Sequence, residues 1–360
     1  MRRREFLDTL GKAAVGLSAL PALSLVGCTD GQSGARNWTW VHGDRDRGLE
    51  EWQRQFARIR GAGIEGVLVG GGDTELLSQA AHGEGLEFHR WTWILNRNSD
   101  AWVKQHRPEW FTVSRNGESS LEHPPYVPYY QWLCPTRWPV REYLRGLVDG
   151  IARDPAVDGV HLDYIRHSDV ILPVGLWSTY DLLQDREYPE FDFCYCDVCR
   201  EAFREQAGID PLDLPDPSQD VAWRTFRWDS VTGLVRELAE AVRARSKHVT
   251  AAVFPTPTLA RTLVRQAWEQ WPLDAFFPML YQNFYEEDLP WLGAATRDGV
   301  TALPERTPLY AGLYLPSLSP DQLSRAVGIV RQAGAAGVSL FEMDGITDAH
   351  LEQLQAALEA

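Results

Sequence analysis

The sequence lacks several features that would indicate a membrane-spanning protein, a nucleotide-binding protein or a common hydrolase. After residue 26, no apolar run is long enough to cross a bilayer as a helix. Neither a G-x-S-x-G elbow nor an H-E-x-x-H segment occurs, which disfavours serine esterases and zinc metalloproteases. The glycines at 70–72 are not followed by Lys-Ser/Thr, so they do not form a phosphate loop.

Positive charge is also scarce, with 35 Lys and Arg against 50 Asp and Glu and a formal charge of −15. Removal of residues 1–27, which hold four basic and two acidic side chains, changes the formal charge to −17. Such a surface repels phosphate backbones, so no nucleic acid partner is expected. Aromatic residues are plentiful, with 15 Trp and 12 Tyr. They fill protein cores, but a sugar-binding cleft also needs their flat apolar faces and polar edges.

The first 28 residues are typical of an export signal rather than of a folded domain. Arg2–Leu7, "RRREFL", resembles a twin-arginine signal, and an apolar run follows it up to Val26. The run ends in "LVGC", which resembles a lipobox with Cys28 as the lipidated residue; an ordinary secretory signal with a chance cysteine is the alternative. We therefore expect a signal peptide (1–27), a linker (28–36) and a lipid anchor to the membrane. The expected location is the periplasm or the cell surface.

Strand-like runs alternate with amphipathic helical runs over residues 37–360. Eight strands are expected, at 38–43, 66–72, 87–95, 159–165, 248–254, 275–281, 309–315 and 337–343. This pattern predicts an α/β fold, the (β/α)8 TIM barrel. An open doubly wound sheet is the alternative, but the first strand-to-helix turn lacks a Gly-rich fingerprint. Two long excursions, 96–137 and 167–228, follow the third and fourth strands, at the barrel end where active sites are built.

Four cysteines lie on the two excursions: Cys134 alone, and Cys194, Cys196 and Cys199 in "FCYCDVC". Zinc binds four thiolates tetrahedrally, and such a C-x-C-x-x-C turn can supply three of them. Two disulfides are the alternative, but three cysteines within six residues compete for one distant partner. The sequence favours a structural zinc site without an open coordination position, and no organic cofactor is expected.

These cysteines, with "REAFREQAGI" after them, are similar to the zinc-cluster region of glycoside hydrolase family 42 β-galactosidases. The resemblance spans residues 132–210. Members of that family are retaining (β/α)8 glycosidases with an Asn-Glu pair at the end of the fourth strand. Asp163-Tyr164 stands there in this sequence, so that catalytic pair cannot be carried over.

The segment 158–167, "DGVHLDYIRH", resembles the fourth-strand motif of the glycosyl-hydrolase-like family 10 barrels. The segments "FFPMLYQ" (276–282) and "GVSLFEMD" (337–344) resemble the sixth and last strands of that group. The resemblance implies a polysaccharide-directed glycosidase fold, a carbohydrate substrate and Asp163 as the catalytic carboxylate.

Strand alternation supports the same role for Asp163. His161 and Asp163 share the face that points into a barrel, while Val160 and Leu162 face the helices. Tyr164 and Arg166 follow at the rim, where they could bind sugar hydroxyls. A structural ion pair between Asp163 and Arg166 is the alternative interpretation.

Glycoside hydrolysis needs a second carboxyl group across the bond. Glu342 is the first choice and Asp344 the second, although alignment of the eighth strand on the fourth places Phe341, not Glu342, opposite Asp163. Other acids remain open: Asp73, Glu286 and Glu287. The hypothesis is that Asp163 acts as nucleophile or general base while Glu342 protonates the leaving oxygen.

Further polar and aromatic residues end strands at the same mouth and are expected to bind substrate: His42, Trp91, Trp93, Tyr281, Gln282 and Tyr314. Asp44 is a further polar lining residue. The sequence thus favours a lipid-anchored glycoside hydrolase. A non-catalytic glycan-binding lipoprotein is the second hypothesis, and a metal-dependent hydrolase with ligands at the barrel mouth is the third.

Overall fold

The computed structural model describes residues 37–44 and 46–360. The expected signal peptide, Cys28 and the linker lie outside the described residues. Among those described, no helix combines the length and the apolar character that a membrane crossing requires.

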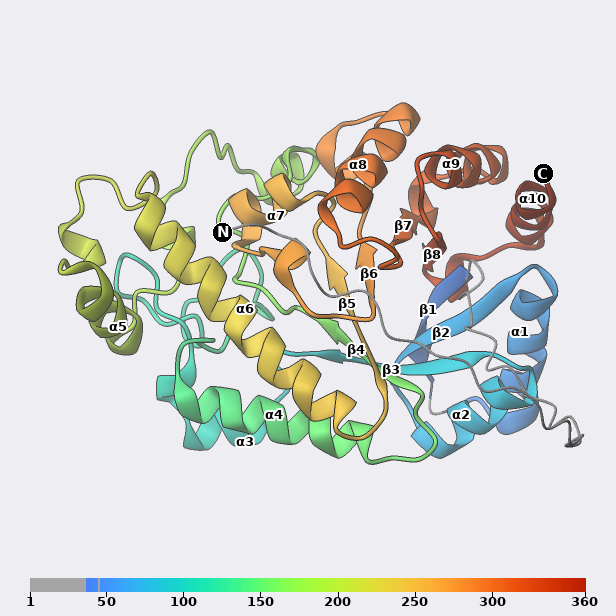
Figure 1. The fold of residues 1–360 in the computed structure, drawn as a ribbon, viewed down its shortest axis with the longest axis horizontal. Coiled ribbons are helices and arrows are strands. Elements are labelled where there is room, and N and C mark those ends of the chain that lie inside the picture. The colour runs from blue at the N-terminus through green and yellow to red at the C-terminus, as the bar shows by residue number, and fades with distance from the viewer. Residues whose placement is uncertain (1–36, 45) are drawn as a thin grey trace, which may run out of the picture. The chain divides into compact units, whose positions relative to one another are not determined.

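The centre of the fold is a barrel of eight parallel strands, as the sequence predicted (Figure 1). The strands are β1 Asn37–Gly43, β2 Ile64–Gly71, β3 Glu87–Trp93, β4 Gly159–Asp163, β5 His248–Val253, β6 Ala275–Pro278, β7 Tyr310–Tyr314 and β8 Gly337–Phe341. Seven neighbouring pairs form continuous ladders in the order β6-β5-β4-β3-β2-β1-β8-β7. The remaining seam, between β6 and β7, is closed by the isolated bridges Phe276–Leu309 and Met279–Gly312. The open doubly wound sheet is therefore excluded.

Helices surround the strands (Figure 1). They are α1 Leu49–Gly61, α2 Thr74–Gly83, α3 Ala101–His106, α4 Trp138–Ala152, α5 Asp197–Ala207, α6 Val221–Arg243, α7 Pro257–Val264, α8 Leu289–Ala302, α9 Pro320–Gln332 and α10 Asp348–Glu359. Side-chain caps fix several starts. Asp73, a candidate acid from the sequence, accepts from the Leu76 amide as the N-cap of α2, and Ser319 and Thr347 form capping boxes.

Strand alternation separates two apolar regions. Val160 and Leu162 of β4 pack in the layer between the barrel and helices such as α4 and α6. His161 points inward and contacts the rings of Trp40 and Phe277 inside the barrel. The interior accommodates large rings because small residues face them: a Cβ on Gly66 would lie 2.3 Å from the Trp38 ring.

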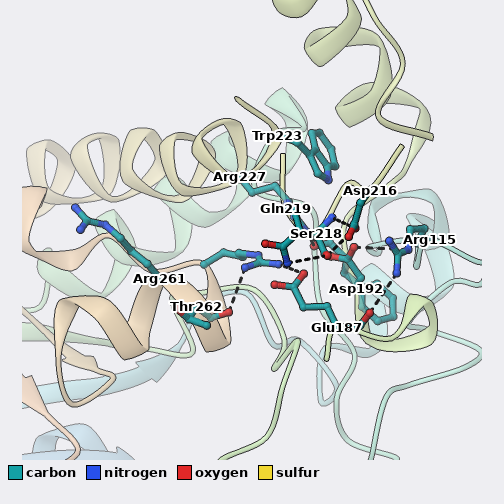
Figure 2. Close-up of polar contacts among 12 residues, drawn as sticks. Arg115, Glu187, Asp192, Asp216, Ser218, Gln219, Trp223, Arg227, Arg261 and Thr262 are labelled. Atoms are coloured by element: carbon teal, nitrogen blue, oxygen red, sulfur yellow. Dashed lines mark hydrogen bonds and ion pairs between the residues drawn. The ribbon is translucent and has the colours of Figure 1, made fainter. Parts of the chain in front are cut away.

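The two excursions, which join β3 to α4 and β4 to α6, are packed against each other. The ring of Tyr126 from the first stacks on Phe191 of the second at a centroid distance of 4.3 Å. A buried polar network lies beneath them, in which Arg115 and Arg227 reach toward Asp192 (Figure 2). The first excursion is therefore attached to the second, and the second to helix α6.

Candidate active site

A pocket of about 420 Å³ opens at the carboxyl ends of the strands, with both excursions in its wall. Thirteen of its 21 lining residues are Trp, Tyr or Phe, and they come from strand ends and from the excursions. Another hollow, at the opposite end of the barrel, is lined mostly by charged and polar residues and contains no Trp, Tyr or Phe. The aromatic pocket is thus the one suited to flat ligands with polar edges, such as sugars.

Asp163 ends β4 on the wall of this pocket and is 8% exposed. Its two carboxylate oxygens each accept one hydrogen bond: Oδ2 from Trp91 Nε1 at 2.8 Å, and Oδ1 from the Tyr164 amide at 2.7 Å. The backbone of Tyr164 is left-handed, with a φ of 48°. Burial raises the pKa of Asp163, against the opposing effects of both donors and the charge of Arg166.

Arg166 lines the pocket but does not pair with Asp163. Its Nη1 donates to Asp169 Oδ2 at 2.9 Å, and both side chains are buried. The guanidinium lies within about 5 Å of the ring centroids of Trp132, Tyr164 and Phe254. The ion pair that the sequence allowed between Arg166 and Asp163 is therefore absent from the described residues, and Asp169 takes the place of Asp163 in it.

Glu342 follows β8 at the rim and does not line the pocket wall; Phe341 before it does. Its Oε2 lies 2.9 Å from Nε2 of His42, which does line the pocket. The buried Tyr281 lies near both candidate acids: after burial, the charges of Asp163, Tyr314 and Glu342 are the next causes of its raised pKa. Asp163 and Glu342 thus both lie near Tyr281, although only Asp163 lines the pocket.

The structure brings most of the expected binding residues together. The pocket is lined by His42, Trp91, Trp93, Tyr164, Arg166, Tyr281 and Tyr314. Others lie elsewhere. His161 is fully buried in the barrel, where its Nδ1 lies 2.8 Å from Thr250 Oγ1. Gln282 donates to Ser317, and Asp344 accepts from Arg47 at 3.3 Å. Asp44 lines a neighbouring hollow, and Glu286 and Glu287 are exposed outside the pocket.

Several pocket residues were not predicted as ligand contacts. Tyr129 and Tyr130 come from the first excursion, and Asp169 and Tyr180 come from the second. The only signal in the sequence was the position of both excursions after strands that end at the active-site mouth. That signal identified the segments, whereas the individual residues depend on how the loops fold.

The four cysteines form a buried cluster, as the sequence predicted. Their Sγ atoms all lie within 4.8 Å of one another, and none is in a disulfide. A tetrahedral ion with metal–sulfur bonds of about 2.3 Å would hold its ligand sulfurs about 3.8 Å apart. The Val113 amide donates to Cys194 Sγ at 3.4 Å, the kind of outer hydrogen bond that supports a thiolate ligand. The cluster therefore fits a structural metal ion, and it links Cys134 on the first excursion to the second.

The similarity to solved structures lies in the fold. The glycoside hydrolase domain of PgaB (BpsB) from Bordetella bronchiseptica is similar with a TM-score of 0.65 and 12% identity, over 89% of this chain and 98% of that one. The catalytic domain of β-amylase from Paenibacillus polymyxa has a TM-score of 0.61 and 10% identity, over 90% and 98%. α-L-Fucosidase isoenzyme 2 from Paenibacillus thiaminolyticus has a TM-score of 0.59 and 14% identity, over 91% of this chain and 49% of that one.

These neighbours share the (β/α)8 scaffold of glycoside hydrolases. No family model matches the chain, and no curated protein matches it. The resemblances to the family 10 type barrels and to the family 42 zinc cluster therefore stay predictions. Fold and site together define a (β/α)8 barrel with an aromatic pocket and a four-cysteine cluster.

Proposed function

We propose that this protein hydrolyses glycosidic bonds in an oligosaccharide or polysaccharide, with Asp163 as nucleophile or general base. The observation that carries the proposal is the position of Asp163 at the end of β4, in the wall of an aromatic pocket. Acidic side chains at that end of a barrel strand are where such enzymes place their chemistry. The glycosidase-type fold of the structural neighbours supports the proposal.

Glu342 is the proposed acid that protonates the leaving oxygen. It stands at the rim, where a glycosidic oxygen leaving the pocket would pass, and His42 holds its carboxylate. Asp169, in contrast, is already paired with Arg166 inside the wall, which suits a structural role. The separation of the two acting carboxyl groups when substrate is bound decides between retention and inversion.

The amide variants Asp163→Asn and Glu342→Gln test this assignment on a panel of chromogenic and polymeric glycans. Each should reduce kcat/KM by about 10²–10⁴-fold, the usual contribution of such groups. Glu286→Gln is the matched control, because Glu286 is exposed outside the pocket. Full activity in both active-site variants would refute the proposal.

A non-catalytic glycan-binding protein is the second candidate. It is favoured by one observation: the other acids in or near the pocket already have partners, Asp169 the guanidinium of Arg166 and Glu342 the ring of His42. Isothermal titration with the same glycans separates the candidates, since binding without turnover by the unmodified protein identifies the binder. The metal-dependent hydrolase loses support, because the four cysteines form the one potential metal cluster among residues 37–44 and 46–360.

We further propose that the cysteine cluster binds zinc in a structural role and that the chain is exported by the twin-arginine route and anchored through a lipid on Cys28. Thiolate chemistry supports zinc, and the N-terminal motifs support export. Metal analysis of the purified protein tests the first part. Membrane fractionation of cells that express the full chain or its Cys28→Ala variant tests the second, because only the lipidated chain should sediment with membranes.

A further inference from the structure

The indole N–H of Trp91 points at the carboxylate of Asp163. Its Nε1 lies 2.8 Å from Asp163 Oδ2, and the two residues are 7% and 8% exposed. The Tyr164 amide occupies the other carboxylate oxygen at 2.7 Å. The carboxylate is therefore held at both oxygens by groups that can only donate, and an indole N–H cannot take up a proton at any working pH.

The plane of the Trp91 ring is fixed from three directions. The ring of Trp40 meets it edge-on at a centroid distance of 5.0 Å, and His42 lies against it at 4.9 Å. Behind it lies Gly70 of β2, where a Cβ would come within 2.8 Å of Trp91 Cε3. Such a contact is too short for any real side chain, so the ring occupies the space that a residue other than glycine would fill.

We propose that Trp91 is a positioning residue, whose indole N–H aims and stabilises the Asp163 carboxylate, and that Gly70 is a glycine because it admits the Trp91 ring. The inference rests on the proposed function for its consequence in catalysis, but the hydrogen bond itself is independent of any substrate. It assigns Trp91 a role beyond the sugar contact predicted from the sequence. It also gives Gly70, the first residue of the glycine segment at 70–72, a steric role.

The physical basis is the effect of a hydrogen bond on a buried charge. Burial favours the neutral form of Asp163, and donors to its oxygens favour the charged form that a nucleophile or base requires. Without the indole donor, no hydrogen bond at Oδ2 would counter the effect of burial on the Asp163 pKa. The carboxyl should then hold its proton to a higher pH and also become free to rotate.

The decisive experiment is Trp91→Phe, which keeps an aromatic ring and removes the N–H. The Asp163 carboxyl is titrated by NMR in protein with 13C-labelled aspartate side chains, and its signal is assigned by its absence from Asp163→Asn. We expect the Asp163 pKa to be higher in Trp91→Phe than in the unmodified protein. The matched control is Trp52→Phe, since Trp52 is buried in α1 and its Nε1 has no partner in the described protein. An unchanged Asp163 titration in Trp91→Phe would overturn the inference.

Kinetics then connect the bond to catalysis. On any glycan that the unmodified protein hydrolyses, Trp91→Phe should lower kcat by about 10–100-fold, as expected for one lost hydrogen bond to a charged group. The limb of the pH profile that reports Asp163 should move in the same direction as the NMR titration. If Trp91→Phe raises the Asp163 pKa but the unmodified protein hydrolyses no glycan, the role of Trp91 is supported and the proposed function is rejected. Failure of the inference and failure of the proposed function can therefore be told apart.

Gly70→Ala tests whether Gly70 makes room for the Trp91 ring, and it leaves Trp91 itself unchanged. The added methyl group should displace the ring and raise the Asp163 pKa in the same direction as Trp91→Phe. Gly146→Ala is its control, because nothing lies within 4 Å of a Cβ at Gly146. If Gly70→Ala folds and leaves the Asp163 titration unchanged, the role given to Gly70 is wrong. If it does not fold, thermal unfolding of the double variant Gly70→Ala/Trp91→Ala decides: the steric conflict predicts recovery of folding, and continued failure contradicts it.

Discussion

At the residue scale, Asp163 is subject to two opposing influences. It is removed from water, which penalises its charge, and it accepts two N–H donors, which stabilise that charge. The net direction is a pKa above the ordinary aspartate value of 3.8. A group in this state changes its charge closer to neutral pH than an exposed aspartate does, which suits proton or covalent chemistry.

The first prediction concerns the pH dependence of activity. If Asp163 acts as nucleophile or base, it must be ionised, so kcat/KM falls as the pH decreases through the Asp163 pKa. Because that pKa is raised, the acidic limb should lie above the range of an ordinary aspartate. The measurement is a profile of kcat/KM between pH 3 and pH 9. A limb at or below the ordinary range would show that burial does not control this carboxyl.

What could be predicted at this scale follows from alternation. The inward direction of Asp163 required only the period of two in a strand. The partner of Arg166 required more: the chain turns after β4 so that Asp169, three residues on, meets the guanidinium. No local pattern distinguishes that pairing from one with Asp163, because both carboxylates lie three residues from Arg166.

At the element scale, the second excursion is fastened to the barrel by buried charges (Figure 2). Arg227 of α6 bonds to Asp192, and Arg265 bonds to Glu187 and to the Thr262 carbonyl. Arg227 and Asp192 are almost wholly buried. Burial raises the pKa of Asp192, but the charges of Arg227 and Arg265 outweigh it and hold the pKa below its usual value.

Removal of one partner should therefore be costly. Arg227→Met leaves Asp192 buried without its directly bonded cation, and only the Tyr195 hydroxyl and the more distant Arg115 and Arg265 remain near its charge. The free energy of unfolding should fall by about 3–5 kcal/mol, measured by urea denaturation at pH 7. Arg54→Met is the control, because Arg54 is exposed and forms no ion pair among the described residues. A loss under about 1 kcal/mol would mean that water already solvates this network.

The effect of pH on this variant has a definite sign. The folded pKa of Asp192 is depressed, so its stabilising contribution is present above the unfolded pKa and is lost as the pH falls through the folded value. The stability difference between Arg227→Met and the unmodified protein should therefore shrink in acid. Urea curves at pH 7 and below pH 4 check this direction.

The cysteine cluster supports a prediction about metal removal. It brings Cys134 next to the segment that carries the other three thiols, so an ion bound there would hold the two excursions together. Cys134→Ser should reduce the metal content well below one ion per chain and lower the Tm, measured by elemental analysis and calorimetry. Cys28→Ser is the control, since the four-thiol cluster is complete with Cys134, Cys194, Cys196 and Cys199. Equal metal content in both variants would contradict a four-thiolate site.

The elements were the most predictable part of the molecule. All eight expected strands are present, because apolar runs between turn signals are long and regular. Their carboxyl ends were placed too late at several strands: β6 ends at Pro278 rather than 281. Apolar side chains continue into the active-site loops there, as at Leu280 and Tyr281, so composition does not mark the point where the ladder stops. The local structure within the two excursions depends on tertiary contacts, so it could not be predicted from the sequence.

At the scale of the whole molecule, the net charge and the lining of the pocket favour the same class of ligand. The surface is acidic, which disfavours nucleic acids, and the pocket presents aromatic faces with few unpaired charges. Ligand binding should therefore depend on stacking and hydrogen bonds more than on long-range attraction. This agrees with an uncharged glycan as the ligand class under the proposed function.

Closure of the barrel is uneven around its circumference, and this leads to the last prediction. β1 and β2 pair along their whole length, from Asn37–Ile64 to Gly43–Gly71, whereas β6 and β7 meet only at isolated bridges. A seam with fewer ladder hydrogen bonds should open at a lower free energy than the rest of the barrel. Hydrogen exchange followed by mass spectrometry should show faster exchange in peptides that cover 309–314 than in those that cover 64–71. Equal protection in both would mean that side-chain packing across the seam, rather than the ladder, controls opening. The comparison matters for function because Tyr281 and Tyr314 stand directly beyond this seam in the pocket wall, so its opening would change the site as well as the barrel.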